Sequence, residues 1–106
     1  MTIGTQYLIF TTMKTYSWDA EKNNNLQKQR GISFEKTIAA IEHGKLLDIL
    51  ENPGRKYAGQ KLYVVEIDRY VYIVPFIETD NELVLITIFP SRKFTTLYLK
   101  KEHRKT

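Results

Sequence analysis

The chain contains no cysteine among its 106 residues. Disulfides, thiolate metal ligands and cysteine nucleophiles are therefore excluded. Long apolar runs are missing too, because none approaches the roughly 18 residues that a membrane-spanning helix needs. The first residues also lack the charged segment and apolar core of a secretory signal. From these absences we expect a cytoplasmic protein with no membrane partner.

Histidine is scarce, and the two histidines are not spaced as metal ligands. No Gly-x-Ser-x-Gly turn and no Gly-rich phosphate loop is present. We therefore expect neither a metal nor a cofactor. His43, which falls near the end of a predicted helix, is interpreted as a residue that contacts free backbone carbonyls.

Acidic residues are fewer than basic ones, so the net charge is +4 and the pI is about 9.3. Such a balance favours an acidic partner, either nucleic acid or an acidic protein. Much of the excess lies in residues 100–105, which are interpreted as a solvated, frayed tail. The length predicts a single domain over residues 1–106.

The first half of the chain predicts a strand and two helices. Apolar residues at Tyr7–Phe10 predict the strand. Asp19 is placed to cap a helix over 20–30, in which Leu26 is the only large apolar residue, and Gly31 to end it. Ser33 is placed to cap a second helix, which His43-Gly44 closes. The apolar face of this helix is formed by Phe34, Ile38 and Ile41.

The second half predicts strands. Leu46–Leu50 fits either a last helical turn or a short strand. Leu62–Ile67 and Tyr70–Ile77 have hairpin spacing, although Pro75 places the second strand at an edge or at a bulge. The other expected elements are a buried central strand over Leu83–Phe89 and a short helix over Thr95–Glu102. The predicted fold class is α+β, with an N-terminal strand, two helices packed on one face of an antiparallel sheet, and a β-meander.

Cations and aromatic residues carry the candidate chemistry. Pro90 should end or bend the pairing of the central strand, so Ser91, Arg92 and Lys93 would stand at the end of that strand as an anion site. A sheet that presents tyrosines for stacking and cations for phosphates fits RNA. The residues of this kind in the second half are Lys56, Tyr57, Tyr63, Arg69, Tyr70, Tyr72, Arg92, Lys93 and Tyr98. Packing accounts equally well for about half of them.

Two ordered blocks resemble a known family. Tyr16-Ser17-Trp18-Asp19 with Lys22-Asn23, followed by residues 31–35 (Gly-Ile-Ser-Phe-Glu), resembles the opening of the BrnT family, aromatic-x-Trp-Asp-x-x-Lys-x…His-Gly-Val-Ser-Phe-Glu. Residues 57–61, 70–76 and 87–93 are similar to a subgroup of it. Gln29-Arg30-Gly31 stands where many members have Lys-His-Gly, so that histidine is missing here.

The resemblance implies a RelE-like fold and a ribonuclease toxin of a type II toxin–antitoxin system. Its metal-independent reaction would be attack of a ribose 2′-hydroxyl on the adjacent phosphate. Arg92 would neutralise the phosphate, and Lys93 or Lys56 would assist it or protonate the leaving oxygen. Tyr57 or Tyr70 would stack a base. Further RNA contacts are expected from Ser91, Arg69 and Tyr72. The implied protein partner is a cognate antitoxin, expected to be a ribbon-helix-helix protein.

A second interpretation is a binding protein without catalysis. A degenerate toxin, or an adaptor for nucleic acid or protein on the same scaffold, would have the same charge and fold. The missing histidine favours this alternative.

Overall fold

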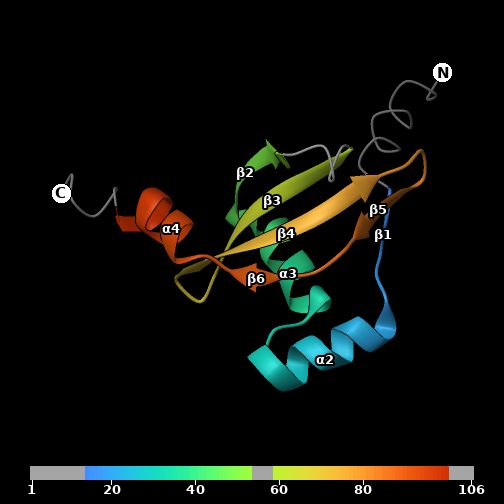
Figure 1. Ribbon diagram of the computed structural model, residues 1–106, viewed down its shortest axis with the longest axis horizontal. Helices are drawn as coiled ribbons and strands as arrows, with labels where there is room; N and C mark the ends of the chain where they lie inside the picture. Colours follow the sequence, from blue (N-terminus) through green and yellow to red (C-terminus); the bar gives the residue numbers. More distant parts are fainter. Residues whose placement is uncertain (1–13, 54–58, 101–106) are drawn as a thin grey trace.

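The computed structural model describes residues 14–53 and 59–100, and its main feature is a mixed sheet (Figure 1). The strands are β1 (Thr15–Ser17), β2 (Leu46–Glu51), β3 (Gln60–Ile67), β4 (Tyr70–Glu78), β5 (Glu82–Leu85) and β6 (Phe89–Pro90). The spatial order is β1-β5-β4-β3-β2, with β6 also beside β4. The α+β class is confirmed. The all-antiparallel sheet is wrong, because β1 runs parallel to β5.

The helices are α2 (Ala20–Arg30), α3 (Phe34–Ala40) with a π-helical turn over Ile41–Lys45, and α4 (Arg92–Thr95), which continues as a π-helical turn over Thr96–Lys100. The predicted start signals are confirmed: Asp19 accepts from the backbone N–H groups of Glu21 and Lys22, and the Ser33 side chain accepts from Lys36 N. Gly31 ends α2 at a φ of +67°. No helix in the described ranges is long and apolar enough to cross a lipid bilayer.

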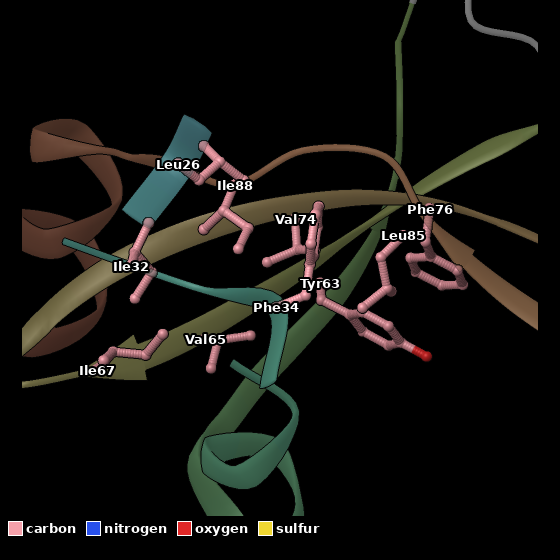
Figure 2. Close-up of a cluster of buried hydrophobic side chains, with 10 residues drawn as sticks. All are labelled: Leu26, Ile32, Phe34, Tyr63, Val65, Ile67, Val74, Phe76, Leu85 and Ile88. Atoms are coloured by element: carbon pink, nitrogen blue, oxygen red, sulfur yellow. The ribbon is translucent and has the colours of Figure 1, made fainter. Parts of the chain in front are cut away.

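Two apolar clusters lie on opposite faces of the sheet. The α2 and α3 side buries Leu26, Ile32 and Phe34 against strand residues such as Val65 and Val74 (Figure 2). Ile38 and Ile41 pack on this cluster and are only partly buried. On the other face, Phe94, Tyr98 and Leu99 of the last helical segment cover Val64, Val71 and Ile73. The expectation of two helices on one face is met, and a third helix covers part of the second face.

The central strand is β4, not Leu83–Phe89 as the sequence predicts. The predicted strand is interrupted, because residues 86–88 lie between β5 and β6. Phe76 pairs with Leu85 but Ile73 pairs with Phe89, so the register shifts by one residue across the interruption. Ile86 N donates to Pro75 O, which places Pro75 beside the interruption. The nitrogen of Pro75 faces the same neighbour and has no proton to donate, so the ladder cannot run through this point.

The structure settles two further predictions, and a third falls on residues that it does not describe. Leu46–Leu50 belongs to a strand, β2. The terminal helix begins at Arg92 rather than at Thr95, because the Ser91 side chain caps it by accepting from Phe94 N at 3.1 Å. The predicted strand Tyr7–Phe10 lies outside the described residues. The N-terminal strand within them is β1, which includes Tyr16.

Candidate functional site

One end of β4 brings together two segments that carry most of the candidate residues. Arg69 lies in the hairpin turn that leads into β4. Tyr70 and Tyr72 are the first and third residues of that strand. Pro90 pairs with Tyr72, and Ser91 N donates to Val71 O at 2.9 Å. The segment Ser91-Arg92-Lys93 therefore joins the sheet beside these tyrosines. We name this set the cationic end; its members are Arg69, Tyr70, Tyr72, Ser91, Arg92 and Lys93.

Helix α4 is held on β4 by a short chain of hydrogen bonds. The Thr95 hydroxyl accepts from Val71 N at 2.8 Å and donates to Ser91 O at 2.7 Å. The Ser91 hydroxyl is itself engaged as the helix cap described above. These contacts are largely buried, so they position the first turn of α4 against the sheet. The role of Ser91 within the site is thus to orient the two residues that follow it, and its predicted contact with RNA stays a prediction.

Arg92 and Lys93 are exposed and occupy the first turn of a helix. This end of a helix carries a partial positive charge. The two cations are therefore repelled by the helix end as well as by each other. Among the described residues, no carboxylate lies within salt-bridge distance of either side chain. Lys93 Nζ lies 5.9 Å from the centroid of the Phe94 ring. An anion bound at this turn would reduce the repulsion between Arg92 and Lys93, because no described carboxylate does so.

The hairpin turn places Arg69 beside the tyrosine pair. Asp68 and Arg69 have φ values of +54° and +66°, the left-handed conformation of a two-residue hairpin turn. Asp68 is bound to Lys36 Nζ of α3 at 2.9 Å, whereas Arg69 is exposed. Tyr70 and Tyr72 form an edge-to-face pair with centroids 6.1 Å apart. Because Tyr72 also packs on the main core, Tyr70 is the better placed of the two for stacking a base.

Lys56 and Tyr57, the remaining predicted site residues, lie outside the described residues. The structure brings together the six residues of the cationic end, and the predicted roles of Lys56 and Tyr57 stay predictions.

Sequence reasoning missed Arg30 as a neighbour of this end. Its Nη1 donates to the carbonyl oxygen of Ile88 at 2.6 Å, two residues before the start of the Pro90-Ser91 junction. The only sequence signal was a basic residue in the last turn of a helix, which the helix dipole already explains. The contact spans 58 positions, and no local pattern reveals it.

The cationic end contains no histidine. His43 Nδ1 lies 2.7 Å from Ala39 O, at the end of α3, as the interpretation of a carbonyl-contacting residue requires. Glu66, which pairs with Val71 across the hairpin, is the carboxylate on the neighbouring strand. In residues 14–53 and 59–100, no group of three or more His, Cys, Asp or Glu side chains is placed to hold a metal ion.

No protein-family model, no curated protein and no solved structure matches this chain. The geometry described above therefore has to be interpreted on its own chemistry. The cationic end has exposed guanidinium and ammonium groups and a half-buried tyrosine pair, and these groups are carried by two neighbouring β-segments. These groups suit a phosphate and an adjoining base.

Proposed function

We propose that this chain is a metal-independent ribonuclease, the toxin of a type II toxin–antitoxin system of the BrnT and RelE kind. The observation that supports the proposal is that the backbone segments of Arg69, Tyr70 and Arg92 meet at one end of β4, through the pairing of Tyr72 with Pro90 and the bond from Ser91 N to Val71 O. These residues come from a turn, a strand and a helix start, and in the proposed site the two guanidinium groups would contact phosphates and the Tyr70 ring would stack a base. The wider resemblance of residues 16–99 to the BrnT family supports the same function.

The proposed reaction is attack of a ribose 2′-hydroxyl on the neighbouring phosphorus. The 2′-hydroxyl loses its proton to solvent water, the 2′,3′-cyclic phosphate forms, and the bond to the 5′-oxygen breaks as that oxygen takes up a proton. Arg92 would bind the non-bridging phosphate oxygens, where negative charge grows in the transition state. Lys93 would donate the proton to the leaving oxygen, and Tyr70 would hold a base so that attack is in line. Lys56 is the other lysine proposed for the proton transfer.

The proposed protein partner is an antitoxin that covers the cationic end with an acidic segment. This partner would neutralise Arg69, Arg92 and Lys93 and exclude RNA from the same surface. Such an interface is screened by salt, because the Debye length falls to about 8 Å at 0.15 M ionic strength.

A non-catalytic adaptor is the second candidate, and one observation favours it. None of the described residues brings an imidazole to the cationic end, and Arg30 stands where many members of the BrnT family have a histidine. A protein of this type would bind RNA through the same side chains without cleaving it. The two functions share their binding surface and differ in whether a cyclic phosphate product forms.

Cleavage of a short RNA by the purified protein in the presence of EDTA tests the proposal. The 2′,3′-cyclic phosphate and 5′-hydroxyl ends should form, and Arg92→Ala should reduce cleavage about a hundredfold or more, since about 1.4 kcal/mol is tenfold in rate. Lys22→Ala, which removes an exposed cation from the far end of α2, is the matched control and should cleave normally. Arg92→Lys should be impaired as well, because a point charge does not replace a bidentate fork.

The melting temperatures of the variants separate function from folding. Arg92 is exposed and has no carboxylate partner in the described part of the chain, so its removal should hardly change stability. RNA binding without any cleavage, with binding lost in Arg92→Ala, would support the adaptor. An absence of RNA binding by the unmodified protein would reject both functions.

A further inference from the structure

We propose that Arg30 binds a second RNA phosphate, next to the one that Arg92 contacts, so that the substrate is an extended single strand rather than an isolated phosphodiester. This inference rests on the proposed function and adds a residue from α2 to its site. Helix α2 is otherwise almost entirely polar and exposed, with Asn23 and Leu26 as its buried residues.

The first argument is position. The Arg30 guanidinium is bound to Ile88 O, and Ile88 is fully buried. Ser91 follows Ile88 by three positions, a length of chain that spans at most about 11 Å. The anchor point of Arg30 therefore lies close to the start of α4, within the reach of a strand of a few nucleotides.

The second argument is the chemistry that the anchor leaves free. A guanidinium has five N–H donors in a plane, and the bond to Ile88 uses one of them. The remaining donors belong to a residue that is exposed and that has no carboxylate within salt-bridge distance in the described ranges. The bond restricts the rotation of the long side chain, so less conformational entropy is lost when an anion binds.

The third argument is the contrast with Lys28. Both cations lie in the last turn of α2 and both suit the negative end of the helix dipole. Residues two apart on a helix point to different sides, and only the Arg30 side chain is bound to the segment that leads to Ser91. Lys28→Gln therefore removes the same charge from the same turn without touching the proposed contact.

The experiment compares Arg30→Gln with Lys28→Gln on two RNAs. The binding arm uses a six-nucleotide RNA with a 2′-deoxyribose at the cleavage position, titrated at several salt concentrations. The logarithm of the association constant falls linearly with the logarithm of the salt concentration. For Arg30→Gln this negative slope should become shallower by about 0.7, the value for one phosphate contact to a single strand. Lys28→Gln should keep the parent slope. Loss of a purely structural bond would lower stability without changing that slope.

The cleavage arm compares the six-nucleotide RNA with a dinucleotide that contains one phosphate. Arg30→Gln should lower kcat/KM for the longer RNA about tenfold, as the loss of one charge-assisted contact predicts, and leave the dinucleotide unchanged. An equal loss on both substrates, or the same slope change in both variants, overturns the inference. If the unmodified protein binds no RNA, the proposed function fails first. If it binds and cleaves RNA and Arg30→Gln behaves like the parent, only the role of Arg30 is rejected.

Discussion

The hydroxyl of Tyr98 donates to Asp48 Oδ2 at 2.8 Å and joins the last helical segment to the edge strand β2. The other carboxylate oxygen, Oδ1, accepts from the backbone N–H of Ile49 at 2.8 Å. One carboxylate thus satisfies a strand N–H group and fixes the helix that covers the second face of the sheet. Burial, and then the hydrogen bond and charge of Asp48, raise the pKa of Tyr98.

Tyr98→Phe should destabilise the protein by about 1 kcal/mol, because it removes this hydrogen bond and keeps the ring in place. The free energy of unfolding from urea titrations gives the measurement. Tyr70→Phe is the matched control: Tyr70 has no side-chain hydrogen bond to another described residue, so its variant should match the parent. Equal stability of the Tyr98 variant and the parent would show that the bond adds nothing.

Asn23→Ala should lower the free energy of unfolding by about 1–3 kcal/mol. Asn23 is buried; its Oδ1 accepts from Phe34 N at 2.8 Å and its Nδ2 donates to Glu35 Oε1 at 2.8 Å. Truncation leaves the buried N–H of Phe34 without its acceptor. The hydrogen bond from Asn23 Nδ2 lowers the pKa of Glu35, so the pKa of Glu35 should move back toward its ordinary value in the variant.

Asn24→Ala is the control for this substitution. Its side chain is exposed one position further along the same helix, and alanine is the better helix former by about 0.5 kcal/mol. It should therefore be neutral or slightly stabilising. Similar losses in the two variants would mean that the bridge from Asn23 to Phe34 does not account for the effect.

Arg69→Gly should stabilise the fold by about 0.5–1 kcal/mol and weaken RNA binding at the same time. Glycine adopts the φ of +66° at this position without steric cost, whereas arginine does not. Arg69→Ala is the control, because it loses the same guanidinium but keeps a β-carbon at positive φ. Both variants should bind RNA equally weakly, and only the glycine variant should gain stability in urea titrations. Unchanged RNA binding in both would remove Arg69 from the site.

The stability of the protein should fall as the pH rises from 10 to 12. Burial, with smaller effects of Tyr16 and Glu78, raises the pKa of Tyr63 to about 12, above its ordinary value of 10. Between these values the unfolded tyrosine has lost its proton and the folded one keeps it, so raising the pH favours unfolding. At about 1.4 kcal/mol per pKa unit, the loss is at most about 2–3 kcal/mol. In Figure 2 the hydroxyl of Tyr63 points away from the other side chains of the cluster.

Tyr63→Phe isolates this contribution from other groups that titrate at high pH. Phenylalanine keeps the stacking on Phe76, whose ring centroid lies 3.9 Å from that of Tyr63. Urea titrations at pH values of about 9, 10, 11 and 12, which bracket the ordinary tyrosine pKa, give the measurement. The free energy of unfolding should decline less steeply with pH in the variant than in the parent. The same decline in both proteins would place the titrating group elsewhere.

Local rules determined much of this fold from the sequence alone. Asp19 and Ser33 cap helices, Gly31 ends one, and Asp68-Arg69 forms a hairpin turn, because each of these features depends on residues within a few positions. The apolar runs Leu62–Ile67 and Tyr70–Ile77, with their hairpin spacing, likewise predict β3 and β4. The grouping of Arg69 with Tyr70 follows from the hairpin itself and needed no three-dimensional structure.

Tertiary structure decided what these rules do not reach. The burial of two sheet faces selects β4 as the central strand, and the missing proton of Pro75 divides the Leu83–Phe89 segment into two. The bond between Arg30 and Ile88, and the pairing that brings Ser91 to Val71, join residues that are far apart in sequence. Such contacts depend on which apolar surfaces pack together and in which register, and a window of neighbouring residues contains neither.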